Sequence, residues 1–349
     1  MNKIAIAGSV LLASLGLVAC GTQSSAGSSA NDQANSTGAS SSTKPVTLYF
    51  GSYSVTKNVY ENELFPAFEK YWKAKTGQTV TFNASFDASG AEARAIASGL
   101  PVDVAALSLE DDVNKIQQAG LITHNWKSGP TGGMVTDSIV AIGVRSGNPK
   151  HITTWSDLAK PGVVVDLPNP STSGGAKWDI NAIYYATSRS NGAKDAESLL
   201  EKILKNVDVL DKSGEASMTT FTSGTGDAIV SYENEILEAS NNLKTFDEVI
   251  PSSTMLIENP IAVVDKNVDK HGDRQVAEAF VQWLEGATAQ QIYMNAGFRP
   301  VDPALKTKAD SLYKTPKDLF TVAQLGGWNK INADLYSTNG IWNTVLESK

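Results

Sequence analysis

The sequence predicts an α/β fold in two lobes, with the second lobe inserted into the first. Segments typical of strands and helices alternate from residue 46 onward, which indicates mostly parallel sheets flanked by helices. The same alternation runs a second time through the middle of the chain before the first pattern resumes. Residues 44–349 are long enough for two domains of ordinary size. We therefore expect residues 44–140 and 259–349 to form lobe I and residues 141–258 to form lobe II.

Lobe I begins with a strand, and a helical pattern follows it. Residues 46–49 are rich in β-formers, whereas Tyr60, Leu64 and Phe68 recur at helical spacing until Gly77. Pro66 either kinks this helix or marks the first turn of a second piece. The other strands expected in lobe I are 79–82, 102–107 and 261–264, and the other helices are 89–99, 111–120, two after residue 264, and the tail to residue 349.

Lobe II is predicted from a second β/α series. Apolar runs bounded by Gly, Pro and Asn indicate its strands, and amphipathic spacing indicates its helices. The expected strands are 138–144, 163–167, 207–210 and 227–232, and the expected helices are 155–158, one after residue 173, 193–205, and one that begins at 217–222. Chain crossings between the lobes are expected near residues 136–146 and 250–262.

The first 19 residues have the features of an export signal. Lys3 precedes an apolar stretch that is too short for a comfortable membrane span. The sequence Leu17-Val18-Ala19-Cys20 fits a bacterial lipobox, which predicts cleavage before Cys20 and a lipid on its sulfur. The alternative is an ordinary signal peptide with an incidental cysteine. Cys20 is the only cysteine, so no internal disulfide is possible.

Residues 20–43 are predicted to be a flexible tether behind that lipid anchor. After Cys20 the segment is almost entirely Ser, Thr, Ala, Gly, Asn and Gln. Such a composition buries too little apolar surface to offset the entropy of ordering the chain. The folded body is therefore expected to lie near a membrane without entering it.

Composition and missing motifs exclude several classes of protein. The net charge of −8 argues against a nucleic-acid partner. The sequence has no Gly-x-Gly-x-x-Gly run and no P-loop, so nucleotide binding is not expected. Its three histidines lie outside any metal-ligand spacing, and a Gly-x-Ser-x-Gly elbow is absent. We therefore expect neither an enzyme, nor a metal, nor a cofactor.

Residues 166–179 predict a strand, a tight turn and the start of a helix. Ser173, Gly174 and Gly175 fall at the helix start, where N–H groups lack intrahelical partners and the helix dipole is positive. Glycines let a ligand approach this backbone, so the segment suits a small anion, even in an acidic protein. The plainer alternative is a serine N-cap followed by two loop glycines.

The same segment resembles a family motif. Pro168-Asn169-Pro170, Ser173-Gly174-Gly175-Ala176 and Trp178 match Pro-Asn-Pro-x-x-Ser-Gly-Gly-Ala-x-Trp of the sulfate-binding proteins, which are solute-binding components of sulfate/thiosulfate ABC importers. The resemblance covers roughly residues 44–349. Other stretches that carry it include Ser52-Tyr53, Gly147-Asn148-Pro149-Lys150, Tyr232-Glu233-Asn234-Glu235, Arg299-Pro300 and Gly326-Gly327-Trp328.

This resemblance implies a type II periplasmic-binding-protein fold with the ligand in the cleft between the lobes. It further implies an exported, monomeric protein that captures sulfate or thiosulfate and delivers it to the permease subunits of an ABC importer. With the predicted lipid on Cys20, the protein would sit at the outer face of the cytoplasmic membrane, in the periplasm where the cell has two membranes.

The resemblance also assigns ligand-binding residues. The family holds sulfate with serine hydroxyls, backbone N–H groups and a Trp indole. These positions correspond here to Ser89, Ser173, Gly174, Gly175, Gly214 and Tyr232. The alternative for Ser89 is a plain helix N-cap. Gly214 lies in a stretch whose match to the family is loose.

Two departures from the family bear on the ligand. Tyr232 replaces the indole donor, and Asp87 stands where the family has glycine. Sulfate carries no proton at neutral pH and suits a site of donors alone, whereas phosphate keeps a proton that needs an acceptor. Our hypothesis is that Asp87 faces away from the ligand, so that sulfate is bound. With Asp87 in the cleft, the alternative ligand is another oxyanion such as phosphate.

Two other functions compete with solute binding. Ser173 is a candidate nucleophile of a secreted hydrolase, although the sequence identifies no base for it. A structural or adhesive lipoprotein would share the two-lobe pattern but would bind no small ligand. Stabilisation by a ligand separates that role from a receptor.

Overall fold

The computed structural model of the protein describes residues 44–349. The expected signal segment, Cys20 and the tether lie outside the described residues. Within the described part, none of the helices combines the length and the apolar composition that a membrane crossing needs.

One sheet of ten strands runs through the described part, in the order β2-β1-β3-β9-β4-β7-β5-β6, with β10 beside β9 and β8 beside β4. The parallel strands form two groups. The first group is β2 (Val80–Asp87), β1 (Val46–Tyr53) and β3 (Val104–Ala106), and the second is β7 (Ala228–Tyr232), β5 (Val165–Pro168) and β6 (Leu210–Asp211). The expected α/β class is therefore confirmed.

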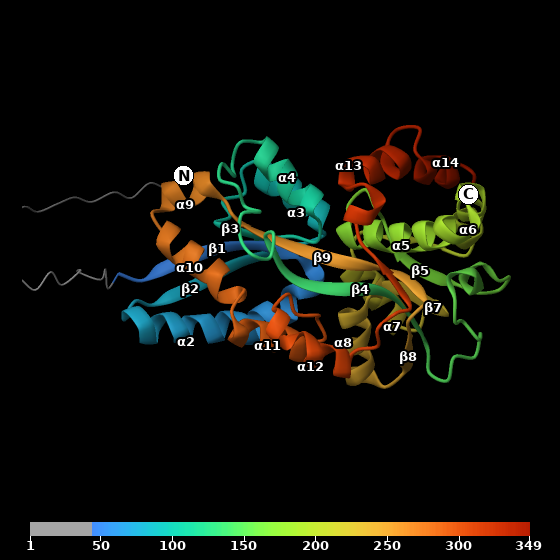
Figure 1. Ribbon diagram of the computed structural model, residues 1–349, viewed down its shortest axis with the longest axis horizontal. Helices are drawn as coiled ribbons and strands as arrows, with labels where there is room; N and C mark the ends of the chain where they lie inside the picture. Colours follow the sequence, from blue (N-terminus) through green and yellow to red (C-terminus); the bar gives the residue numbers. More distant parts are fainter. Residues whose placement is uncertain (1–43) are drawn as a thin grey trace, which may run out of the picture. The chain divides into compact units, whose positions relative to one another are not determined.

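Two long antiparallel strands connect these groups. They are β4 (Met134–Arg145) and β9 (Ser253–Val263), which pair with each other along the middle of the sheet (Figure 1). The last residues of β9 pair with β3, and the second half of β4 pairs with β7. The chain therefore passes from the first group to the second along β4 and returns along β9. The lobe boundaries predicted from the sequence stay a prediction.

Helices cover both faces of each group of strands. Their bounds are α1 (Lys57–Val59), α2 (Phe65–Thr76), α3 (Ser89–Ala97), α4 (Glu110–Gln118), α5 (Gly174–Asn191), α6 (Ala193–Lys205), α7 (Gly214–Thr222), α8 (Glu233–Leu243), α9 (Asp265–His271), α10 (Arg274–Leu284), α11 (Ala287–Asn295), α12 (Pro303–Leu312), α13 (Trp328–Ile331) and α14 (Ile341–Glu347). Two further short strands are β8 (Phe246–Val249) and β10 (Asp318–Phe320).

The alternation of side chains along each strand explains this covering. On β3, Val104 and Ala106 pack with α2 and α10, whereas Ala105 packs with α3 and α4. On β4, Val140 and Ile142 join the cluster around α5 and α6, and the residue between them joins the cluster of α7 and α8. Because successive strand residues point to opposite faces, strands buried on both faces are nearly continuous apolar runs.

Several local predictions are confirmed, and others are wrong in length. Helix α2 ends before Gly77, which has a left-handed φ of 76°. Pro66 lies in the first turn of α2, after a π-helical turn, so it marks the start of a second piece. The strand expected at 261–264 begins earlier, at Ser253. Polar residues before Pro260 interrupt the apolar pattern, so the sequence did not indicate the first part of this strand. The strand expected at 207–210 is only Leu210–Asp211.

The C-terminal segment packs elsewhere than expected. We expected all of residues 259–349 to complete lobe I, but α13 and α14 lie over α5 and α6 (Figure 1). Trp328 contacts Trp178 of α5 edge to face, with ring centroids 5.0 Å apart. Trp342 belongs to the same apolar cluster. The expectation is wrong for this tail, since a helical pattern does not tell which apolar surface a helix will cover.

This packing predicts a large loss of stability when Trp342 is shortened. Its side chain is 3% exposed, so Trp342→Ala should lower the free energy of unfolding by about 3–5 kcal/mol through lost burial and a cavity. Leu346 on the same helix is 39% exposed, and Leu346→Ala serves as the matched control with a small effect. Urea unfolding measures both variants. Equal losses would contradict the buried position of α14.

Candidate functional site

Four segments that follow the carboxyl ends of strands meet at one place. Ser89 begins α3 after β2, Ser108 follows β3, Ser173 follows β5, and Tyr232 ends β7. All four residues are buried. In open α/β sheets, this edge is where ligands bind, because strand ends and helix starts present their backbone groups there. The candidate site therefore takes residues from both groups of parallel strands.

The start of α5 provides the clearest set of hydrogen-bond donors. Ser173 has extended backbone angles, and its Oγ accepts a hydrogen bond of 3.2 Å from the Ala176 N–H. The N-cap interpretation is therefore confirmed, and it leaves the hydroxyl hydrogen of Ser173 free to donate. The N–H groups of Gly174 and Gly175 belong to the first turn and have no intrahelical acceptor. Three donors are thus concentrated within three residues.

Ser108 and Tyr232 approach the start of α5 closely, which explains why residues 174 and 175 are glycines. A Cβ at Gly174 would lie 2.6 Å from Ser108 Oγ, which is far inside van der Waals contact. A Cβ at Gly175 would lie 3.2 Å from Tyr232 Cε2. Any other residue at position 174 would push the serine away. The glycines therefore allow Ser108, Tyr232 and the start of α5 to lie side by side.

Ser108 is a functional candidate that the sequence analysis missed. Its Oγ lies 2.6 Å from the Tyr232 hydroxyl, and this hydrogen bond joins the end of β3 to the end of β7. The Ser108 carbonyl accepts from Trp178 Nε1 at 3.1 Å and from Asn259 Nδ2 at 3.0 Å. The available signal was its place directly after an expected strand, at the edge where ligands bind.

Ser89 is close to the other site residues, but its hydroxyl has protein partners. Its Oγ donates to Asp112 Oδ2 at 2.6 Å and accepts from the Ser108 N–H at 3.0 Å. Ala88 is the N-cap of α3, so the N-cap alternative for Ser89 is wrong. The next N–H, that of Gly90, donates to the Thr172 carbonyl at 3.0 Å. The assignment of Ser89 to the ligand stays a prediction.

Gly214 begins α7 but faces different neighbours. A Cβ there would lie 3.2 Å from Val55 Cγ2 and 3.6 Å from Glu235 Oε2. Ser213 caps this helix start, accepting from the Ala216 N–H at 3.1 Å. Among residues 44–349, no hydrogen bond joins Gly214 to Ser173 or Tyr232. Its place in the site stays a prediction.

Asp87 lies at the surface, at the end of β2. It is exposed, and its Oδ1 accepts from the Ala88 N–H at 2.7 Å, beside the first turn of α3. The carboxylate thus lies at a helix start, where the helix dipole favours negative charge. The exposed position supports the hypothesis that Asp87 faces away from the ligand.

Buried acidic groups lie behind Tyr232. Burial, and then the neighbouring Glu235, raise the pKa of Asp179 well above its usual value. Burial raises the pKa of Glu235 to about 7, although a hydrogen bond from Ser231 opposes this. Burial also raises the pKa of Tyr232, whose phenol therefore keeps its proton and can donate. Asp179 therefore adds little negative charge to the site at neutral pH, whereas Glu235 is partly ionised at pH 7.

A small cavity with basic side chains opens beside the start of α5. Its volume is about 210 Å³, and Ser173, Gly174, Arg94, Lys177 and the ion pair of Lys115 with Asp112 line it together with residues of the tail. Burial lowers the pKa of Lys177, which Asp111 partly offsets. Burial acts on Lys115 as well, but Asp112 outweighs it and raises that pKa above its usual value. The cations favour the approach of an anion.

A hydrolytic mechanism finds no support in these contacts. Among the described residues, no histidine is hydrogen-bonded to Ser173, and both histidines with carboxylate partners pair with Asp265 or Asp103 instead. The Ser173 oxygen accepts from the Ala176 N–H as a helix cap. The serine therefore lacks the adjacent base that activates a nucleophile.

Comparisons with known proteins agree with the expected family. The model of the family described as bacterial extracellular solute-binding protein matches residues 53–299. A sulfate-binding protein of Synechococcus elongatus is 40% identical, covering 91% of both chains. A sulfate-binding protein of Escherichia coli is 36% identical, covering 86% of this chain and 93% of its own. A thiosulfate-binding protein of Pseudomonas aeruginosa is 34% identical, over 84% and 90%.

Solved structures give the same result. The sulfate-binding protein SubI from Mycobacterium tuberculosis superimposes with a TM-score of 0.78 at 33% identity, covering 84% of this chain and all of its own. A periplasmic thiamin-binding protein superimposes with a TM-score of 0.64 at 14% identity, which shows the fold alone. The two-lobe type II periplasmic-binding-protein fold expected from the sequence is confirmed.

The buried carboxyls predict that the protein gains stability as pH falls from about 8 to about 5. Folded Glu235 keeps its proton up to about pH 7, whereas the unfolded chain loses it near 4.5, so between these values the folded state binds more protons. Glu248, with a pKa of about 7, and Asp137, with a pKa of about 8, act in the same direction. Urea unfolding across this pH range measures the slope.

The variant Glu235→Gln should flatten part of that slope, because the amide does not titrate. Glu347→Gln, at an exposed position, is the matched control and should leave the slope unchanged. A free energy of unfolding that rises from pH 5 to pH 8 would contradict protonated buried carboxyls.

Proposed function

The chain belongs to the bacterial extracellular solute-binding protein family, and from this premise we propose that it captures sulfate between its lobes for an ABC importer. Its relatives are sulfate- and thiosulfate-binding proteins, so its role is to bind a solute and not to catalyse a reaction. The start of α5 carries the proposal. There a serine hydroxyl and two N–H groups face a buried contact between the two groups of strands.

The chemistry of these donors favours an ion without a proton. Ser173, Gly174 and Gly175 offer only hydrogens toward the ligand, and the dipole of α5 adds positive potential. Sulfate accepts at every oxygen, so each donor can be paired. Because burial raises the pKa of Asp179 well above its usual value and that of Glu235 to about 7, these carboxyls repel the ion less than ordinary carboxylates would.

Tyr232 can replace an indole as the opposing donor. Its hydroxyl and Ser108 Oγ lie 2.6 Å apart, and either oxygen can be the donor of that bond. When Ser108 donates to the phenol, the phenolic hydrogen is free to point at the anion. The position is held by the stacked ring of Tyr53, whose centroid is 5.9 Å away. The pair therefore retains a neutral donor where the family has tryptophan.

Contacts between the two groups of strands describe the closed state of the receptor. Gly90 N–H donates to the Thr172 carbonyl at 3.0 Å, and Arg94 Nη1 donates to the Ser171 carbonyl at 3.3 Å. Opening breaks these contacts, the Ser108–Tyr232 bond, and other polar contacts such as the one from Trp178 Nε1 to the Ser108 carbonyl, while the β4–β9 ladder acts as the hinge. Closure removes the anion from water and gives the permease a distinct form to recognise.

We further propose that the exported protein is a monomer and is held at the membrane by a lipid on Cys20. The lipobox and the polar composition of residues 21–43 support this anchor. A lipid anchor with a long tether lets the receptor reach its permease partner while it stays outside the cytoplasm.

One observation favours a second candidate, an oxyanion that keeps a proton. Asn259 donates to the Ser108 carbonyl through Nδ2, while its Oδ1 is buried without a hydrogen-bond partner in the described part of the chain. Asp179 Oδ1 is likewise buried without a partner. Either oxygen could accept the proton of hydrogen phosphate if it faces the ligand. Competition between the two anions decides between the candidates.

Calorimetric titration of the purified protein with sulfate tests the proposal, first alone and then in excess phosphate. We expect one sulfate per chain, with an affinity that phosphate leaves unchanged, because a proton on the ligand would remain unpaired among donors. Displacement of sulfate by phosphate would favour the second candidate. An absence of heat with both ions would reject an oxyanion receptor.

Ser173→Ala should weaken sulfate binding by about 1–3 kcal/mol, since it removes one donor to a charged ligand. Asp302→Ala, which removes an N-cap bond of 2.8 Å from a different helix, controls for the loss of capping. Titration of both variants measures the difference. If Ser173→Ala bound sulfate as tightly as Asp302→Ala, Ser173 would not be part of the site.

A further inference from the structure

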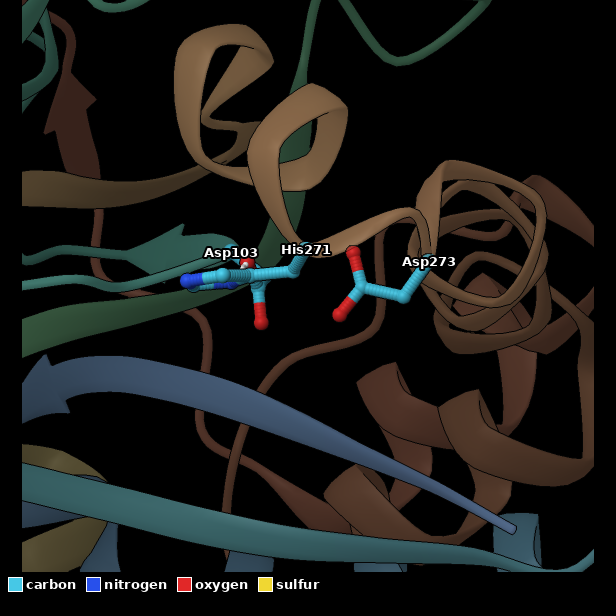
Figure 2. Close-up of side chains that lie close together, drawn as sticks. All are labelled: Asp103, His271 and Asp273. Atoms are coloured by element: carbon cyan, nitrogen blue, oxygen red, sulfur yellow. Dashed lines mark hydrogen bonds and ion pairs between the residues drawn. The ribbon is translucent and has the colours of Figure 1, made fainter. Parts of the chain in front are cut away.

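A second cluster of polar side chains lies at the opposite, amino end of β3. It consists of Asp103, which precedes β3, His271, which ends α9, and Asp273, which precedes α10 (Figure 2). One nitrogen and two carboxylate oxygens from these residues all lie within 4.8 Å of one another. Asp103 and Ser108 lie at opposite ends of β3, with four residues between them, so the cluster is distinct from the candidate sulfate site.

Asp103 is the fixed member of the cluster. Its side chain is 0% exposed, and its Oδ2 accepts from the Tyr49 N–H of β1 at 2.8 Å. Its Oδ1 lies 2.6 Å from His271 Nδ1. The backbone bond orients the carboxylate so that the second oxygen faces the imidazole. Such outer hydrogen bonds orient the ligands of metal sites in proteins.

Asp273 adds an acidic group whose buried oxygen lacks a partner. The residue is 5% exposed, and its Oδ1 is buried without a hydrogen-bond partner among residues 44–349. Asp273 occupies the N-cap position of α10, yet its side chain makes no capping bond. Figure 2 shows its carboxyl group directed toward the other two side chains. A buried acceptor without a partner is costly, so this arrangement calls for a positive group.

A neighbouring pair shows what the cluster lacks. His124 Nδ1 lies 2.7 Å from Asp265 Oδ2, which repeats the arrangement of His271 and Asp103. There the third side chain is Arg274, whose guanidinium lies 2.8 Å from Asp265 Oδ1. In the cluster, the third side chain is a second carboxylate. Among the described residues, no lysine or arginine forms an ion pair with Asp103 or Asp273.

We propose that Asp103, His271 and Asp273 bind a divalent transition-metal cation of the Zn²⁺ type. An imidazole nitrogen with carboxylate oxygens suits zinc, whereas Mg²⁺ and Ca²⁺ prefer oxygen ligands alone. The His271 side chain is 22% exposed, which leaves a solvent side for a water ligand. Tetrahedral zinc needs ligand atoms roughly 3.3 Å apart, given bonds of about 2.0–2.2 Å. The three atoms, which lie within 4.8 Å of one another, would adjust to that spacing when the ion binds.

The metal would join two separate segments of lobe I. It ties the junction of α9 and α10 to the start of β3, whose other end leads to Ser108. A cation that binds the folded state and not the unfolded chain raises stability with its concentration. The proposed site therefore stabilises the scaffold behind the sulfate site and takes no part in binding the anion.

The test uses the purified full chain, without an affinity tag, after removal of metals with a chelator. We expect zinc chloride to bind with one ion per chain in calorimetry and to raise the melting temperature. Asp273→Asn should weaken zinc binding at least tenfold, because even outer-shell changes cost about 10–100-fold. His124→Gln removes the neighbouring imidazole and is the matched control, with zinc binding unchanged. Magnesium chloride should give no comparable shift.

Sulfate titration of Asp273→Asn in the absence of zinc shows whether the variant is folded, since the sulfate site lies elsewhere. Loss of the zinc response with sulfate binding retained is the expected result. Zinc binding as tight in Asp273→Asn as in the unchanged protein would overturn the proposal. So would an unchanged protein that does not respond to zinc, because the three groups would then hold only a shared proton.

Discussion

The rest of the structure depends on the antiparallel pairing of β4 with β9. Within residues 44–349, the chain passes from the first group of parallel strands to the second along β4 and returns along β9, and the tail crosses again through β10, which pairs with the start of β9. The β4–β9 ladder fixes the place where the carboxyl ends of β3 and β7 face each other. This is why Ser108 and Tyr232 are in contact. Without a fixed ladder, donors on the two sides would not share one ligand. The strands that connect the lobes therefore also align the two halves of the site.

Local dipoles explain how an acidic chain can hold an anion. The net charge is −8, yet three cations, Arg94, Lys115 and Lys177, line the cavity at the start of α5, together with Asp112, which pairs with Lys115. Burial raises the pKa of the acidic groups behind Tyr232, because it penalises their charged forms, and so reduces their negative charge. A site of neutral donors needs no counter-ion that would have to be desolvated on closure. Selectivity among anions then depends on whether a hydrogen of the ligand is left without an acceptor in the site. The net charge of the protein matters little.

The sequence was sufficient where the signal is local. Ser173, Gly174 and Gly175 are neighbours in the chain, so their place at a helix start could be predicted together with the donors they offer. Ser108 and Asn259 enter the site only because β3 and β9 pair, and no local pattern carries that information. The tail was assigned to the wrong lobe for a similar reason, since Trp342 shows that α14 needs an apolar surface but not which one.

Two clusters of buried polar groups, one at each end of β3, thus present opposite charge problems. At the carboxyl end of β3, unpaired N–H groups from the facing helix concentrate positive potential, and an anion satisfies them. At the amino end of the same strand, Asp103 and Asp273 concentrate negative potential around one imidazole, and only a cation or a proton can satisfy it. At Asp265 the chain supplies its own cation, Arg274. A buried carboxylate for which the chain supplies no cation is therefore the place to look for a bound cation.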